Sequence, residues 1–139
     1  MMDASWPDVH MLIRHWESEM NFYKDELRFL MILFEKYFTA MVEKENIEAT
    51  KTVATSLTAV DLSRSTLTER LHRSSKQISD AAANGNVTEQ EATSLKNSFQ
   101  LLEDELTAFV QKVRELKSMV FQLTERIAKT EQARHLISE

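Results

Sequence analysis

Apolar side chains recur along the first third of the chain at spacings that alternate between four and three residues. This spacing puts every member on one face of an α-helix and is typical of the seam along which helices pack in a coiled-coil-like bundle. It therefore predicts one long helix over about residues 6–43. The series consists of Val9, Ile13, Trp16, Met20, Tyr23, Leu27, Leu30, Phe34, Tyr37 and Met41.

A second series with the same spacing predicts a third helix over about residues 89–136. Its members are Leu95, Phe99, Leu102, Leu106, Phe109, Val113, Leu116, Val120, Leu123 and Ile127. A weaker series between the two predicts a middle helix over about residues 47–83. Its members are Val53, Leu57, Val60, Arg64, Leu67, Leu71, Ser74 and Ile78. Because Ser and Thr crowd this segment and compete for backbone hydrogen bonds, we expect it to be the most exposed of the three helices.

Turn residues are scarce, since the chain contains one Gly and one Pro. Sheets and long loops need such residues, so their scarcity indicates an all-helical chain with few turns. Gly85 after Asn84 predicts a left-handed end for the middle helix. Thr88 and Glu91 have the spacing of a capping box, which predicts that the third helix starts there.

The starts of the first two helices are predicted from weaker signals. Ser5 is the expected N-cap of the first helix. The apolar series changes phase between Met41 and Val53, and one straight helix cannot keep both stripes against one partner. We therefore place a turn within residues 44–49, with Asn46 as the cap of the middle helix.

Short connections place neighbouring helices antiparallel. The chain is therefore predicted to be a single helical domain over residues 1–139, an all-α antiparallel three-helix bundle of long coiled-coil-like helices. At about 1.5 Å per residue, the end of the first helix comes level with about residue 126 of the third. The third helix should then overhang at its C-terminus by about 12 residues. Ile127, Leu136 and Ile137 would lack partners within the chain.

The first helix carries apolar side chains on nearly every side between residues 29 and 34. Phe22, Phe29 and Ile32 fall on the face turned away from the seam, whereas Phe38 widens the seam on one side. A helix that is apolar all round is normally buried on several sides. The middle helix, rich in Ser and Thr, cannot supply that cover alone.

Three explanations of this apolar surface remain open. The first helix could lie deep within its own bundle, a small apolar ligand could bind between helices, or a second chain could cover the outer face. Three large apolar side chains can hide several hundred Å², an area that usually marks an interaction site. We favour a homodimer through this face, because two-fold dimers are the commonest assemblies. Leu136 and Ile137 could dock on the second protomer, and another protein could take the place of the second copy.

The most suggestive polar residues are Glu19, Glu69 and His72. Glu69 and His72 have the E-x-x-H spacing of di-iron bundles, and an antiparallel register brings Glu19 level with His72. A di-iron site needs a second such pair, which the sequence lacks, so we expect no cofactor. The favoured interpretation is a network of ion pairs, with Glu19 near His72 and Glu69 paired with Arg73 four residues later. A metal or small ligand held between the first two helices is the alternative function.

Other classes of function find little support in the composition. Cys is absent, which excludes a disulfide framework and a thiolate site. The net charge of −5 argues against nucleic acid or an anionic membrane as partner, since both reward a basic face. The sequence shows neither a signal peptide nor the roughly 20 apolar residues of a membrane-spanning helix. We expect a cytoplasmic, non-enzymatic interaction or structural bundle that self-associates through an apolar face of its first helix.

Overall fold

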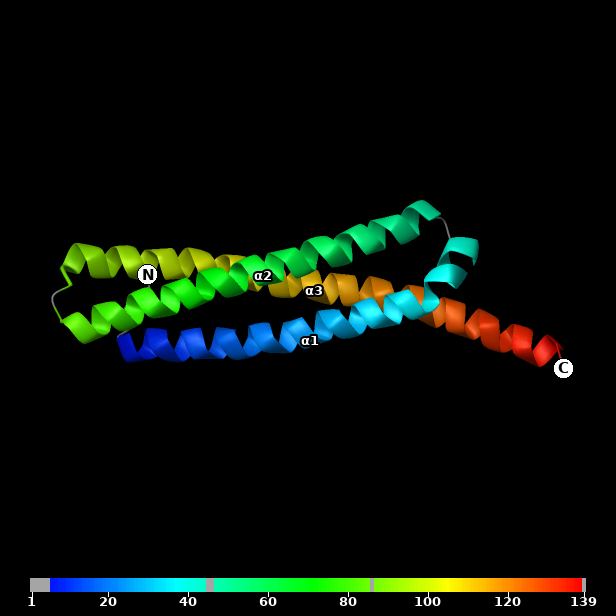
Figure 1. Cartoon of the computed structure of the whole chain (residues 1–139), viewed down its shortest axis with the longest axis horizontal. Helices are drawn as coiled ribbons and strands as arrows, with labels where there is room; N and C mark the ends of the chain where they lie inside the picture. Colours follow the sequence, from blue (N-terminus) through cyan, green and yellow to red (C-terminus); the bar gives the residue numbers. More distant parts are fainter. Residues whose placement is uncertain (1–5, 45–46, 86, 139) are drawn as a thin grey trace. The chain divides into compact units, whose positions relative to one another are not determined.

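Three α-helices account for almost all of the described chain (Figure 1). The structure is a computed structural model that describes residues 6–44, 47–85 and 87–138, without the side chains of Lys44 and residues 133–138. The helices are α1 (Trp6–Lys44), α2 (Ile47–Asn84) and α3 (Glu89–Ser138).

The all-α class predicted from the spacing of apolar residues is confirmed, and the described ranges contain no strand. The predicted helix ranges differ from the observed bounds by no more than two residues. The change from α1 to α2 falls within the predicted turn, because α1 ends at Lys44 and α2 begins at Ile47. The proposed caps Ser5 and Asn46 lie outside the described residues.

Contacts divide the chain into two compact units, and each unit contains a segment of all three helices. Unit 1 consists of Met1–Tyr23 and Leu62–Val110, and unit 2 consists of Lys24–Asp61 and Gln111–Glu139. The N-terminal part of α1 thus packs with the C-terminal part of α2, and the reverse holds in unit 2. This exchange is the signature of antiparallel neighbours. Whether the two units act as a single domain stays a prediction.

Helices α1 and α3 run in the same direction within each unit. In unit 1, Trp16 Nε1 donates a hydrogen bond of 2.9 Å to Glu103 Oε2, and further along the Tyr23 and Phe109 rings lie 5.9 Å apart. In unit 2, Lys117 Nζ lies 2.5 Å from Glu26 Oε1, and further along both helices the Phe29 and Phe121 rings lie 6.3 Å apart. Two parallel helices with an antiparallel α2 form the predicted three-helix bundle.

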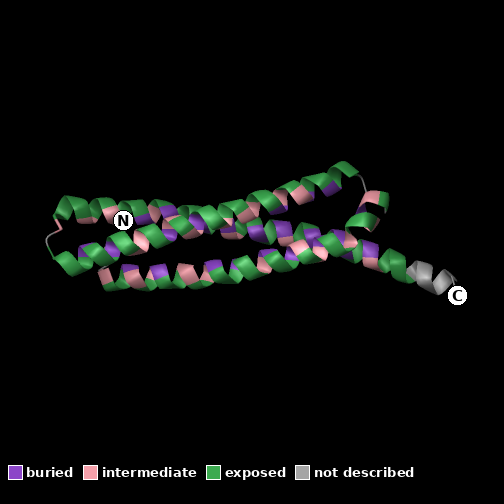
Figure 2. Cartoon of the chain, in the orientation of Figure 1, coloured by how far each residue is buried: buried purple, intermediate pink, exposed green. Residues whose placement is uncertain are grey.

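The predicted seams of α1 and α3 make up most of the buried core. Buried residues recur along one face of each helix (Figure 2). The members that are no more than 2% exposed are Val9, Ile13, Met20, Leu27, Leu30, Met41, Phe99, Leu102, Leu106, Val113, Val120 and Ile127. Burial of such side chains contributes about 1.5–3 kcal/mol each, so these two seams supply most of the hydrophobic stabilisation.

The seam of α2 is weaker, as its composition predicts. Val60, Arg64 and Ser74 are only half-buried, whereas Leu71 is fully buried. Thr50 lies one step before the first predicted seam residue and is 1% exposed. The seam therefore begins one step earlier than the apolar series indicated, since a small polar residue occupies that position.

The turn between α2 and α3 has the predicted chemistry. Gly85 has a φ of 63°, a left-handed conformation that a Cβ would strain. Thr88 caps α3, because its hydroxyl accepts a hydrogen bond of 3.1 Å from the Glu91 amide. The Thr88 carbonyl accepts the first helical hydrogen bond, 3.0 Å long, from the Ala92 amide. The boundary is confirmed at atomic detail.

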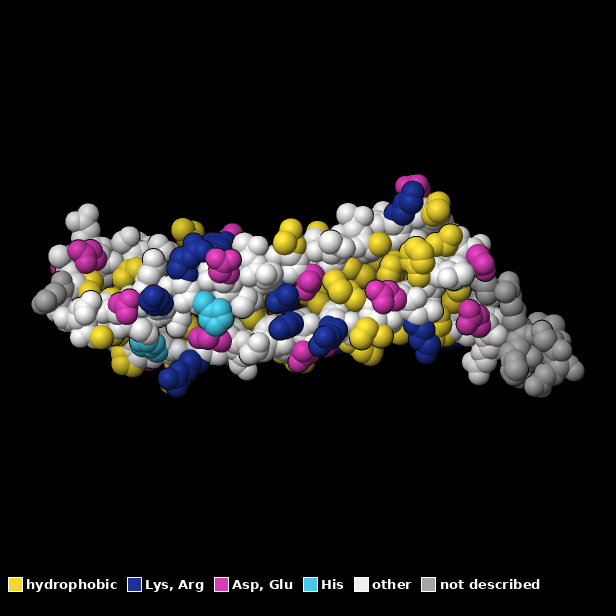
Figure 3. All heavy atoms as spheres, viewed as in Figure 1, with side chains coloured by type: hydrophobic (Ala, Val, Ile, Leu, Met, Phe, Trp, Pro, Cys, Tyr) yellow, Lys and Arg dark blue, Asp and Glu magenta, His cyan; other side chains and the backbone are white. Residues whose placement is uncertain are grey.

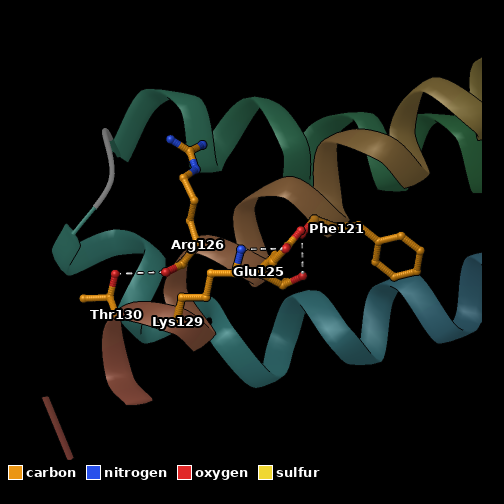
Figure 4. A network of polar contacts seen from close by, with 6 residues as sticks. Phe121, Glu125, Arg126, Lys129 and Thr130 are labelled. Atoms are coloured by element: carbon orange, nitrogen blue, oxygen red, sulfur yellow. Dashed lines mark hydrogen bonds and ion pairs between the residues drawn. The ribbon is translucent and has the colours of Figure 1, made fainter. Parts of the chain in front are cut away.

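Helix α3 continues past the end of α1 in unit 2 (Figure 1). The expectation that Ile127 would lack partners is wrong, because its side chain is 2% exposed. From Lys129 to Gln132 the residues are exposed, and Lys129 and Thr130 bond to other residues of α3 (Figure 4). Lys129 Nζ lies 2.9 Å from Glu125 Oε1, and the Thr130 hydroxyl donates to the Arg126 carbonyl at 2.9 Å. The core therefore extends further along α3 than simple helix lengths predicted.

Candidate interaction surface

Two large apolar side chains are exposed on the outer face of α1 in unit 2. Phe29 is 51% exposed and Ile32 is 60% exposed, while the adjacent seam residue Leu30 is fully buried. Residues three apart on a helix are neighbours on its surface, so Phe29 and Ile32 form one continuous apolar area. The described part of the chain leaves this area open to solvent, as the position of both residues off the seam predicts.

Helix α3 enlarges this surface with a residue that the sequence reasoning missed. Phe121 is 37% exposed, and its ring centroid lies 6.3 Å from that of Phe29 in an edge-to-face arrangement. We call Phe29, Ile32 and Phe121 the outer patch. The signal was present in the sequence, because Phe121 directly follows the seam residue Val120 and is apolar where a polar residue is expected.

A charged residue holds the edge of the outer patch in place. Lys117 Nζ lies 2.5 Å from Glu26 Oε1 and 5.6 Å from the centre of the Phe121 ring. The ammonium thus links α1 to α3 and covers one side of the ring. Such a contact orients Phe121 but leaves its other side accessible.

Phe38, which was grouped with Phe29 and Ile32 in the predicted interface, lies on a different face of α1. It is 45% exposed and lines a groove of about 370 Å³ between α1 and α2 in unit 2. Hydrophobic side chains gather there over the C-terminal half of α1 and the N-terminal half of α2 (Figure 3). The groove is lined by Met31, Phe34, Glu35, Phe38, Ala54, Leu57 and Thr58. The exposed apolar side chains of α1 in unit 2 therefore lie on two separate surfaces, the groove and the outer patch.

Phe22 belongs to unit 1 and is 55% exposed. Its ring packs edge-on against the buried Tyr23, with 5.2 Å between centroids. Phe22 thus has a partner on one side and solvent on the other. The remaining predicted interface residues, Leu136 and Ile137, have side chains outside the described part of the structure.

The three residues of the metal alternative do not converge. His72 Nδ1 lies 3.9 Å from Glu17 Oε2, so the acidic neighbour of His72 is Glu17 where Glu19 was predicted. Glu69 pairs with Arg73 at 3.0 Å, which confirms that part of the predicted network. Among the described residues, no three His, Asp or Glu side chains come close enough together to hold a metal ion.

Unit 1 also contains an ion pair between α2 and α3 that the sequence reasoning missed. Arg70 donates from Nη2 to Glu105 Oε2 at 2.5 Å. This hydrogen bond lowers the pKa of Glu105 and raises the pKa of Arg70, because it favours the charged form of both groups.

No protein-family model, curated protein or solved structure matches this chain. None of the described helices carries an apolar stretch long enough to cross a bilayer.

Proposed function

We propose that the chain is a non-enzymatic interaction or structural bundle that self-associates through the outer face of α1. The observation that carries this proposal is the exposure of Phe29 and Ile32, at 51% and 60%, next to a fully buried seam. A cytoplasmic location is part of the same proposal and rests on the sequence features described above.

A second copy docked on the outer patch would remove apolar area from water. The outer patch of two copies can bury several hundred Å², the range in which exposed apolar patches usually mark interaction sites. At about 25 cal/mol per Å², this burial contributes roughly 5–10 kcal/mol before the costs of association. That is enough to decide between a monomer and a dimer at ordinary concentrations.

The test is the solution mass of a variant in which both exposed residues are charged. Phe29→Glu with Ile32→Glu places two carboxylates where an apolar contact is proposed, and burying an unpaired charge is costly. We expect the wild-type chain to be a dimer by light scattering and the double variant to be a monomer with unchanged helicity by circular dichroism.

A matched control is available in unit 1. Leu62 and Leu101 are 68% and 66% exposed, so Leu62→Glu with Leu101→Glu introduces the same charges at positions somewhat more exposed than Phe29 and Ile32. This control should keep the mass of the wild-type protein. A chain shortened after Gln132 tests the predicted contribution of Leu136 and Ile137 in the same assay.

Each outcome has a defined meaning. A dimeric Phe29→Glu, Ile32→Glu variant with intact helicity would exclude this face as the interface, and a monomeric wild type at all accessible concentrations would exclude self-association. If the double variant unfolds, the single change Ile32→Glu at the more exposed position replaces it. A folded, dimeric Ile32→Glu variant then contradicts the proposal.

A further inference from the structure

The outer face of α1 in unit 2 carries a second series of residues with seam spacing. Asp25, Phe29, Ile32 and Lys36 follow one another at steps of four, three and four residues, and all are exposed. Residues spaced in this way lie on one stripe of a helix and can form the contact line of a helix pair. The stripe has an apolar centre, an acidic N-terminal end and a basic C-terminal end.

This order of charges suits a second copy that runs in the opposite direction. When two such helices pair antiparallel about a point between Leu30 and Met31, Phe29 meets Ile32 of the second copy. In the same register, Asp25 meets Lys36 of the second copy. The two-fold axis repeats each contact, so two apolar pairs lie between two ion pairs.

Residues beside the stripe are complementary in the same register. Arg28 and Glu35 are exposed, and Glu35 lines the groove between α1 and α2. Arg28 lies seven residues before Glu35 and therefore on the same side of α1. In an antiparallel helix pair, positions on this flank face each other across the contact line, which brings Arg28 opposite Glu35 of the second copy. The axis again repeats the contact. Two independent pairs of positions therefore match in charge at one register.

We infer that the second copy docks antiparallel on the outer face of α1, with Phe29 against Ile32 and Asp25 against Lys36. The inference rests on the proposed self-association and adds its direction and register. Lys36 Nζ lies 5.5 Å from the centre of the Tyr37 ring in the single chain, and its flexible stem can turn from there toward a carboxylate. On the other flank, Phe121 extends the apolar centre.

Other arrangements of the same two helices fit less well. A parallel pair places Asp25 beside Asp25 and Lys36 beside Lys36 of the second copy, and like charges repel. Moving the antiparallel register by one heptad places Ile32 against Lys36, or Asp25 against Phe29. Each alternative loses the apolar centre or the ion pairs.

Charge exchange tests the register. Asp25→Lys or Lys36→Asp alone converts both ion pairs into repulsive pairs, and we expect each to raise the dimer Kd roughly 10- to 100-fold. The combined variant, Asp25→Lys with Lys36→Asp, restores opposite charges and should bring Kd back to within about threefold of wild type. Asp80→Lys, an exposed change in unit 1, gives the same change in net charge as Asp25→Lys and should leave Kd unaltered.

Cross-linking tests the direction, because the chain contains no Cys of its own. In the antiparallel register, position 25 of one copy lies next to position 36 of the other, whereas two copies of position 25 are eleven residues apart, roughly 16 Å. A disulfide needs Cα atoms within about 7 Å. A mixture of Asp25→Cys and Lys36→Cys should therefore form a covalent dimer, and neither variant should do so alone.

The two proposals fail in different ways. A monomeric wild type overturns self-association and the inference together. A dimer in which either Cys variant cross-links with itself, or in which the mixture does not cross-link, overturns only the antiparallel register. Equal effects of Asp25→Lys and Asp80→Lys on Kd would likewise overturn the register alone.

Discussion

At the scale of single residues, Phe29 and Leu30 are neighbours in the chain with opposite environments. Leu30 is fully buried and Phe29 is 51% exposed. Consecutive residues on an α-helix are turned by about 100°, so one step moves a side chain from the seam to the flank. The exposure of Phe29 is therefore a consequence of its position in the heptad, and its apolar nature is what favours a partner.

The ion pair between Arg70 and Glu105 contributes to folding stability in a way that depends on pH. The hydrogen bond from Arg70 lowers the pKa of Glu105 in the folded chain below its value in the unfolded chain. A carboxyl group with a lowered folded pKa adds stability above the unfolded pKa, and this stability is lost as the pH falls through the folded pKa. The pair should therefore stabilise unit 1 at neutral pH and cease to do so in acid.

We expect Glu105→Gln to lower the free energy of unfolding at pH 7, because the charge-assisted bond to Arg70 is lost. The difference from wild type should shrink as the pH falls below about 4, where unfolded-state carboxyl groups become protonated. Urea unfolding at pH 7 and pH 3 measures both values. Glu115→Gln, at another exposed position of α3, is the control, and a difference that is equal at the two pH values would contradict this account.

At the scale of elements, α2 forms a helix although its high Ser and Thr content lowers its intrinsic helix propensity. Several of its hydroxyl groups nevertheless bond within the helix. Thr52 donates to the Glu48 carbonyl at 2.9 Å, and Thr68 donates to the Arg64 carbonyl at 2.7 Å. These hydroxyl groups bond to carbonyls of α2 itself and leave its helical backbone intact. Packing along the seam supplies most of the stability of the helix.

The N-terminus of α3 depends on one hydroxyl group. We expect Thr88→Ala to destabilise the chain by about 1 kcal/mol, because the Glu91 amide loses the acceptor that lies 3.1 Å away. Thr88→Ser keeps the hydroxyl and should remain close to wild type. Urea unfolding monitored by circular dichroism separates the two variants, and equal stability of Thr88→Ala and Thr88→Ser would show that the cap contributes nothing.

At the scale of the whole molecule, the proposed self-association would couple to the stability of the fold. A second copy that binds only the folded chain stabilises the folded state, and this effect grows with protein concentration. The Tm of a dimer therefore depends on protein concentration. A hundredfold increase above Kd should raise the Tm of the wild-type chain by roughly 3–6 °C. Differential scanning calorimetry at two concentrations measures this shift.

The variant with Phe29→Glu and Ile32→Glu should show a Tm that does not depend on concentration. High salt should reduce the shift in the wild type, because the inferred ion pairs are exposed and therefore screened. A wild-type Tm that stays constant over a hundredfold range would contradict self-association independently of the light-scattering result.

The fold followed closely from residue spacing. Spacings that alternate between four and three residues place side chains on one stripe of any long helix, so the seams of α1 and α3 could be predicted from the sequence. The Thr88 cap could be predicted from its spacing to Glu91. The faces of α1 could be assigned in the same way, which is why Phe29 and Ile32 were expected to be exposed.

Contacts between helices required the packed structure. The axial offset between α1 and α3 brings Phe121 to Phe29. The offset between α1 and α2 brings Glu17 to His72. A heptad pattern repeats every seven residues and is nearly unchanged when one helix slides along another. Periodicity therefore specifies which face packs, whereas the offset depends on how side chains of particular size and charge fit together in three dimensions.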